Sequence, residues 1–172
     1  MRSIRLAALA LAMCALAACT ADYLPKGESS LYRDLAQPGA ELDAPAAASV
    51  ISGYRANHGL DAVTLDPALM KLAEAQASAM AKRNKLDHNI IKPFNARIKE
   101  SGFDAKAAAE NIGAGYGTIA EAFSGWRESS AHNANMLLRG ATRMGIAAVY
   151  APQTKFKVFW SLILAAPDDR KG

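Results

Sequence analysis

The spacing of the apolar residues changes once along this chain, near Gly140. Before that point apolar side chains recur at the three- and four-residue intervals of helices. After it, residues 143–150 alternate and residues 156–164 are rich in aromatic and branched side chains, with residues 152–155 between them as a turn. This pattern predicts a terminal β-hairpin. Helices followed by a hairpin predict a layered α+β domain with one core.

Capping and stop signals predict five helices ahead of the hairpin. Asp66-Pro67 is the clearest start, because the aspartate accepts from first-turn amides and proline suits the first helical position. Thr118 with Glu121 has the capping-box spacing. The predicted helices cover residues 43–58, 66–83, 93–101, 118–126 and 130–139.

The N-terminus has the pattern of an export signal. Arg2 and Arg5 precede thirteen apolar residues, 6–18, fewer than the about 20 needed to span a bilayer. The segment ends in Leu-Ala-Ala-Cys, which resembles the lipobox of bacterial lipoproteins, where Cys19 becomes the lipidated N-terminus. An ordinary cleavage near Ala18 or Ala21 is the alternative. We expect an exported protein held at the membrane by its N-terminal lipid.

The N-terminal segment also bears on the destination of the protein and on the composition of the mature chain. Thr20, not an aspartate, follows Cys19, so resemblance to Gram-negative sorting rules favours the outer membrane, facing the periplasm. With Cys14 removed and Cys19 lipidated, no thiol is left for a disulfide. Loss of two arginines leaves 18 basic residues against 16 acidic, a net charge of +2 without basic blocks. Nucleic-acid binding is therefore disfavoured.

The predicted organisation has four parts. Residues 1–18 form the signal peptide, and residues 19–42, with prolines, glycines and paired serines but no apolar period, form the lipidated cysteine and a flexible linker. Residues 43–166 form the domain, and residues 167–172 a tail.

Glu110 is followed by three glycines at alternating positions, Gly113, Gly115 and Gly117. A dinucleotide loop needs GxGxxG, but Thr118 stands where the last glycine would be, and no P-loop lysine follows. The segment is therefore not a phosphate-binding loop. Glu110 lies among apolar residues, which fits either a buried carboxylate with partners or a surface glutamate at a loop edge.

Three histidines occur in the chain. His58 lies at a helix end, where an imidazolium suits the dipole, and a structural role is favoured. His88 and His132 each follow a helical pattern that ends in polar residues. Together with Glu110 they could bind zinc or another divalent ion and leave one position for water. Their spacing of 22 residues fits no local ligand motif.

A serine hydrolase is a further candidate, because Ser129 and Ser130 lie near His132. Such an enzyme of the α/β type exposes its nucleophile on a strained GxSxG turn. No GxSxG motif occurs in this sequence, so a serine hydrolase is disfavoured.

Taken together, short motifs of this chain resemble the CAP superfamily, which includes cysteine-rich secretory proteins, antigen 5, plant pathogenesis-related proteins and bacterial SCP-like domains. Each motif is weak alone, and their order is specific. The motifs are Tyr-Arg-Ala-Asn-His-Gly-Leu at 54–60, Leu-Asp-Pro-Ala-Leu at 65–69, Leu-Asp-His at 86–88, Glu-Asn-Ile at 110–112, Gly-Trp at 125–126, His-Asn-Ala-Asn at 132–135 and Phe-Trp at 159–160.

The resemblance implies an α-β-α sandwich with a central antiparallel sheet. It also implies a cavity lined by two histidines and two glutamates, which bind a divalent metal in some members. By position His88, Glu110 and His132 match three of these residues, whereas Ser129 stands at the second glutamate, with Glu128 adjacent. A hydroxyl in place of a carboxylate removes one negative charge, so we expect weak or water-completed zinc binding, if any.

Three functions follow from this resemblance and from the residues. The first is a non-catalytic envelope module that binds a lipid, a sterol-like molecule or a cell-wall fragment. The second is a structural or interaction protein in which His88, Glu110 and His132 form a buried hydrogen-bond cluster. The third is a metal-dependent, protease-like hydrolase, with His88 and His132 as ligands and Glu110 as ligand or general base. We rank them in this order, so that a binding protein is expected rather than an enzyme.

Overall fold

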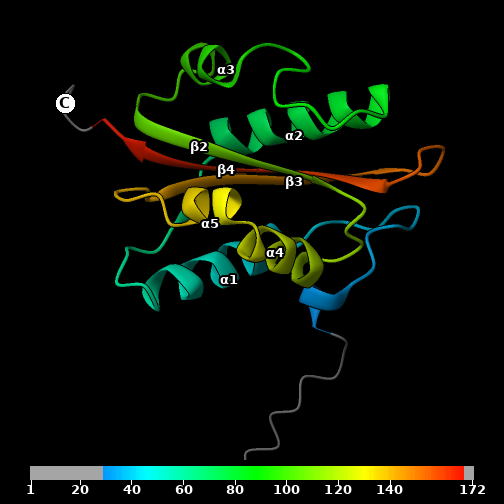
Figure 1. Cartoon of the computed structure of the whole chain (residues 1–172), viewed down its shortest axis with the longest axis horizontal. Coiled ribbons are helices and arrows are strands. Elements are labelled where there is room, and N and C mark those ends of the chain that lie inside the picture. The colour runs from blue at the N-terminus through cyan, green and yellow to red at the C-terminus, as the bar shows by residue number, and fades with distance from the viewer. Residues whose placement is uncertain (1–28, 169–172) are drawn as a thin grey trace, which may run out of the picture.

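The structure is a computed structural model and describes residues 29–168. The chain forms a sandwich in which helices cover both faces of one sheet (Figure 1). α2 and α3 lie over one face, and α1, α4 and α5 lie over the other. The elements are η1 Ser30–Tyr32, α1 Ala44–Ala56, β1 Thr64–Leu65, α2 Pro67–Arg83, α3 Phe94–Glu100, β2 Ala105–Ala114, α4 Ile119–Glu128, α5 Ser130–Met136, β3 Arg143–Ala151 and β4 Lys157–Pro167.

The sheet has the strand order β1-β3-β4-β2. The predicted hairpin is confirmed as β3 and β4, which pair antiparallel from Arg143 opposite Ala165 to Ala151 opposite Lys157. β2 pairs antiparallel with the other side of β4. The two-residue β1 runs parallel to β3, so the sheet is mixed, although its three long strands are antiparallel as expected.

β2 was not anticipated from the sequence. Its first half, Ala105–Ala109, is alanine-rich and has little intrinsic strand preference. Pairing with β4 decides its structure, with Glu110 opposite Ile163. Glu110 therefore lies within a strand at an edge of the sheet, and not at the edge of a surface loop.

All five predicted helices are present, and their caps follow the sequence. The Asp43 carboxylate accepts from Ala46 N at 2.9 Å. The Asp66 carboxylate accepts from Leu69 N at 3.0 Å. The Thr118 hydroxyl accepts from Glu121 N at 3.2 Å. Local hydrogen bonds thus define where α1, α2 and α4 begin. None of the helices within residues 29–168 combines the length and apolar character needed to cross a membrane.

The core lies on both faces of the sheet. On the α1, α4 and α5 side the rings of Trp126 and Trp160 meet edge to face, with centroids 6.2 Å apart. On the other side Leu69 of α2 packs on Ile163 of β4. Gly145 of β3 lies directly against the backbone of Leu69, so α2 approaches the sheet closely.

The start of the described chain corrects part of the predicted linker. Leu35 is buried in the core, and its N–H donates to Gly117 O at 2.7 Å. Residues 30–42 therefore pack against the domain and do not act as a flexible tether, because the buried leucine holds them there. The predicted signal peptide, Cys19, the first part of the linker and residues 169–172 lie outside the described residues. At the other end β4 extends to Pro167, the first residue of the predicted tail.

Candidate functional site

Glu110 is the centre of the candidate site. It lies in the second half of β2, and only 1% of its side chain is exposed to solvent. A buried carboxylate needs partners for its charge and its oxygens. Its partners are Arg97 of α3, His88 of the loop before α3, and Ser161 of β4, whose hydroxyl donates to Oε1 at 3.5 Å.

Arg97 of α3 is the main partner of Glu110. Its Nη2 lies 2.9 Å from both carboxylate oxygens, and its side chain is 4% exposed. Nε donates to Lys92 O at 3.2 Å and Nη2 to His88 O at 3.0 Å, while the guanidinium stacks over the Phe94 ring. Sequence reasoning missed this residue. The available signal was a cation next to Ile98 and three residues after Phe94, on the apolar face of a short helix.

His88 reaches Glu110 from the loop between α2 and α3. Its Nδ1 lies 2.9 Å from Glu110 Oε2, and 47% of its side chain is exposed. A carboxylate paired with arginine only accepts hydrogen bonds, so Nδ1 carries the proton and donates. The loop is held in place by Gln76, whose amide donates to Asp87 O at 2.8 Å. His88 and Glu110, two of the three predicted site residues, therefore lie in direct contact.

His132 lies in the first half of α5, on the opposite side of the sheet edge. Its carbonyl accepts from the Asn111 amide at 2.9 Å. Burial lowers the pKa of His132, and the positive charge of nearby His88 lowers it further. His132 is therefore neutral near pH 7. The structure brings it close to His88, but its ring has no hydrogen bond to Glu110 among the residues described.

Two asparagines connect α5 to β2 and were also missed. The Asn135 amide donates to Glu110 O at 3.2 Å and to the Asn111 side-chain oxygen at 2.9 Å. The backbone around Glu110 is thus fixed from the α5 side, and the carboxylate from the α3 side. In the motif Glu-Asn-Ile only the glutamate was predicted as a site residue. Its asparagine, Asn111, also contributes, because its amide bonds the backbone of His132 in α5.

Ser129 and Glu128, the two candidates for a fourth position, lie at the junction of α4 and α5. Ser129 is half-buried and Glu128 is exposed. Within residues 29–168 neither side chain bonds to Glu110, His88 or His132. The structure therefore adds no second carboxylate to the group that we call the His/Glu cluster, which is His88, Glu110 and His132.

The donor set of this cluster does not fit a divalent ion. In the part of the chain that the structure describes, no three His, Cys, Asp or Glu side chains are placed to hold a metal. Both oxygens of Glu110 face the Arg97 guanidinium, and Oε2 also accepts from His88. A divalent ion at Glu110 would lie beside a buried positive charge, which is electrostatically unfavourable.

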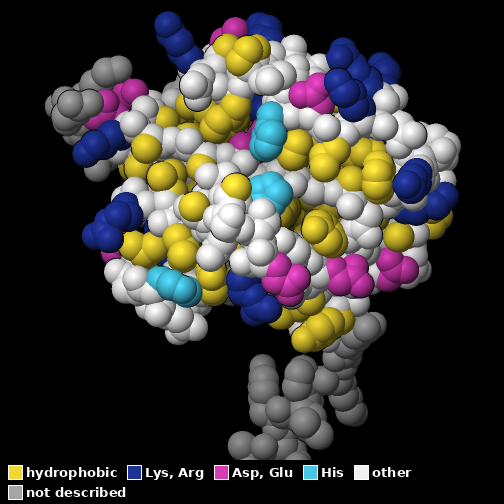
Figure 2. Space-filling view, viewed as in Figure 1, with side chains coloured by type: hydrophobic (Ala, Val, Ile, Leu, Met, Phe, Trp, Pro, Cys, Tyr) yellow, Lys and Arg dark blue, Asp and Glu magenta, His cyan; other side chains and the backbone are white. Residues whose placement is uncertain are grey.

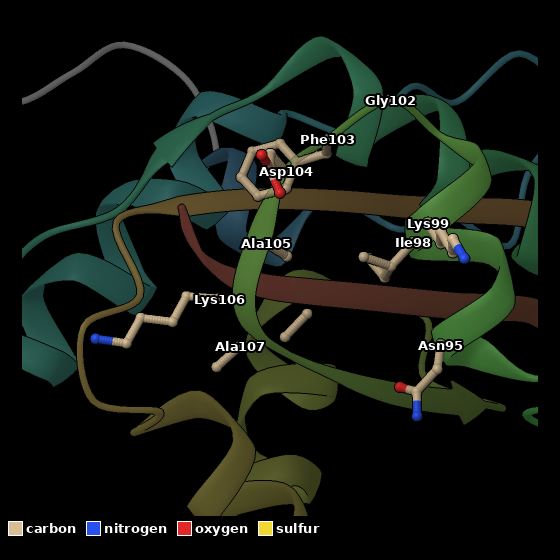
Figure 3. Close-up of a pocket in the computed structure, with 10 residues that line it drawn as sticks. Asn95, Ile98, Lys99, Gly102, Phe103, Asp104, Ala105, Lys106 and Ala107 are labelled. Atoms are coloured by element: carbon tan, nitrogen blue, oxygen red, sulfur yellow. The ribbon is translucent and has the colours of Figure 1, made fainter. Parts of the chain in front are cut away.

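Cavities flank α3 on both sides. One, of about 530 Å³, lies between α3 and the beginning of β2, with Asn95, Ile98 and Lys99 on one wall and residues 102–108 on the other (Figure 3). The other, of about 390 Å³, lies between α2 and α3; we call it the α2–α3 groove. The groove is walled by Ala68, Leu72, Ala75, Ile91 and Arg97, with Lys71, Lys92, Glu100 and Ser101 completing it.

Neither cavity beside α3 is lined by His88, Glu110 or His132. Arg97 joins the two features, because it lines the groove and bonds Glu110. Figure 2 shows histidine side chains near the middle of this face, with hydrophobic side chains around them. Arg97 would thus lie between a ligand in the groove and the His/Glu cluster.

Comparison with known proteins gives a consistent result. A family model described as "Cysteine-rich secretory protein family" matches residues 48–164, within the predicted domain of 43–166. No curated protein matches the chain significantly. Solved structures that match are bacterial extracellular or surface proteins, among others.

Two of these structures show how much the matched proteins differ in the share of their own length that is covered. An extracellular protein with an SCP domain from Bacillus anthracis is 20% identical with a TM-score of 0.61, covering 70% of this chain and 39% of that one. An outer surface protein from Borrelia burgdorferi is 16% identical with a TM-score of 0.65, covering 73% of this chain and 93% of that one. The chain thus spans well under half of the Bacillus protein and almost all of the Borrelia protein. At these identities the likeness shows the fold.

Proposed function

Since this chain belongs to the cysteine-rich secretory protein (CAP) family, we propose that it is a non-catalytic binding module of the bacterial cell envelope. It takes a small amphiphilic ligand, a lipid or a cell-wall fragment, beside the His/Glu cluster. The apolar part of the ligand occupies the α2–α3 groove, and its polar part lies toward His88.

The engagement of Glu110 carries this proposal. Its carboxylate is the only acidic group of the cluster, and it already binds Arg97 and His88 while shielded from solvent. A general base must be free to accept a proton from a bound substrate or water. Glu110 accepts hydrogen bonds from the Arg97 guanidinium and the His88 ring. The cluster therefore supports binding and positioning rather than acid-base chemistry.

The α2–α3 groove supports an amphiphilic ligand. Its volume of about 390 Å³ is in the range of small-molecule sites. Ala68, Leu72 and Ala75 give one apolar wall along α2, and the half-exposed Ile91 gives another. Lys71 and Lys92 stand at the rim, where they suit an anionic or polar head group.

Binding to the groove can be tested by filling it. Ala75→Trp places a large ring in the groove, while Ala62→Trp puts the same ring on an exposed loop elsewhere. The protein is extracted from its native membrane for lipid mass spectrometry and is titrated with palmitate, a lysophospholipid and a muropeptide. We expect at least one probe to bind, with affinity reduced tenfold or more by Ala75→Trp only. A protein that carries and binds none of them, or an Ala75→Trp variant that binds like wild type, contradicts the proposal.

A structural role is the second candidate, favoured by the buried contacts that Arg97, Glu110 and His88 make between α3, β2 and the intervening loop. If the role is structural, Ala75→Trp should not change the affinity for any of the probes. A metal-dependent hydrolase is the remaining alternative, and it requires a metal to displace Arg97 from Glu110. Turnover of a peptide library by wild type but not by His132→Ala would support the hydrolase.

A further inference from the structure

We propose that Arg97 is the resident cation of the His/Glu cluster: its guanidinium occupies the position beside Glu110 that a divalent metal would need. The wild-type protein therefore has little affinity for zinc there, and removal of Arg97 creates a zinc site. This inference does not depend on the proposed ligand-binding function.

The placement of Arg97 is the first argument. Nη2 lies at 2.9 Å from each oxygen of Glu110, so one nitrogen stands between both oxygens, as a metal bound by both oxygens of a carboxylate would. The carboxylate belongs to β2 and the guanidinium to α3, two elements packed directly on each other. The charge of the buried glutamate is thereby balanced without any added ion.

The second argument is that Arg97 is held in this position independently of Glu110. Lys92 O accepts from Nε, His88 O accepts from Nη2, and the Phe94 ring lies below the guanidinium with its centroid 5.2 Å from Cζ. A metal would have to displace a side chain fixed by these contacts. Within residues 29–168 Nη1 has no hydrogen-bond partner, so hydrogen bonds compensate the burial of this guanidinium only in part.

The third argument is what remains when the guanidinium is removed. Glu110 would then be a buried carboxylate without its arginine partner, and His88 Nδ1 already lies 2.9 Å from its Oε2. A carboxylate and an imidazole whose Nδ1 has released its proton are zinc ligands, and water can complete the coordination. The site therefore needs a cation, and zinc can replace arginine.

The experiment compares zinc binding by the full-length protein and four variants, with zinc alone as the probe. Arg97→Ala removes the cation, and Arg97→Lys keeps a positive charge. Arg97→Ala combined with His88→Ala removes a ligand of the new site. Arg127→Ala removes a positive charge from the exposed surface of α4 and is the matched control. Binding is measured by calorimetric titration and elemental analysis, and thermal melting is followed with and without zinc.

We expect Arg97→Ala to bind one zinc per chain at least tenfold more tightly than wild type and to melt at a higher temperature with zinc. Wild type, Arg97→Lys and Arg127→Ala should not show this gain, and the double variant should lose it. If Arg97→Ala does not fold without metal, zinc should restore its folding. Stoichiometric zinc in wild type, or an Arg97→Ala protein that neither binds zinc more tightly nor is rescued by it, overturns the proposal.

Discussion

At the scale of single residues, His132 makes the stability of the fold depend on pH. Its pKa is lowered below the ordinary value of 6.5, first by burial and then by the positive charge of His88. In the unfolded chain the imidazole regains its ordinary pKa, so the unfolded state binds more protons as the pH falls below about 6.5. Stability is therefore fully present above that pH and decreases in acid.

The replacement His132→Gln should reduce this acid sensitivity. Between pH 7.5 and pH 5 we expect the free energy of unfolding to fall further in wild type than in the variant, by a small amount because the ring is partly hydrated. Urea denaturation at both pH values measures the difference. Each protein is compared with itself at pH 7.5. A larger loss of unfolding free energy in His132→Gln than in wild type would contradict the predicted direction of the pH effect.

The site residues differ in how far the sequence could reveal them. His88, Glu110 and His132 were predicted from their place in the family motifs, and the structure pairs His88 with Glu110. Arg97 and Asn135 were not predicted, because their roles depend on which strand faces α3 and α5. A single arginine on a short helix has no local pattern that distinguishes a buried ion pair from a surface charge.

At the scale of elements, the contact of α2 with β3 depends on one glycine. A Cβ at Gly145 would fall on the backbone carbonyl of Leu69, and backbone cannot move aside as a side chain can. Gly145→Ala should therefore lower the free energy of unfolding by about 3 kcal/mol. Gly53→Ala, in an open position of α1, is the control and should raise it by up to about 1 kcal/mol. Denaturant unfolding compares the two, and equal stabilities would contradict the close packing.

Elements with local signals were predicted and elements without them were not. Asp43, Asp66 and Thr118 each provide a cap whose hydrogen bond spans two or three residues, so α1, α2 and α4 begin where the sequence indicates. β2 has alanines where strands have branched residues, and it forms because β4 offers a partner more than 40 residues away. Such pairing is decided by tertiary structure.

At the scale of the whole molecule, attachment to the membrane remains a prediction for residues outside the described part of the chain. Cys19→Ala should abolish incorporation of labelled fatty acid into the protein, since the acyl chains are expected on that cysteine. Cys14→Ala, in the segment that is removed, should keep the label and is the matched control. Labelling of Cys19→Ala, or the absence of label in wild type, would refute lipidation at this position.

The packing of Leu35 bears on how such a protein stands on a membrane. Residues 30–42 are part of the folded unit, so the predicted linker is shortened to residues 20–28, which lie outside the described residues. Nine residues reach about 30 Å when fully extended. The domain is therefore expected closer to the membrane than a 23-residue linker would allow.

By itself the sequence determined the fold class, the helix starts and the terminal hairpin, because each is encoded in local periodicity, in caps or in the order of family motifs. It also predicted His88, Glu110 and His132 as site residues. Only the tertiary structure decided that β2 is a strand, that Leu35 belongs to the core and that Arg97 neutralises Glu110. The reason is physical: these three features depend on contacts between segments that are distant along the chain, and a buried charge selects its partner in space rather than in sequence.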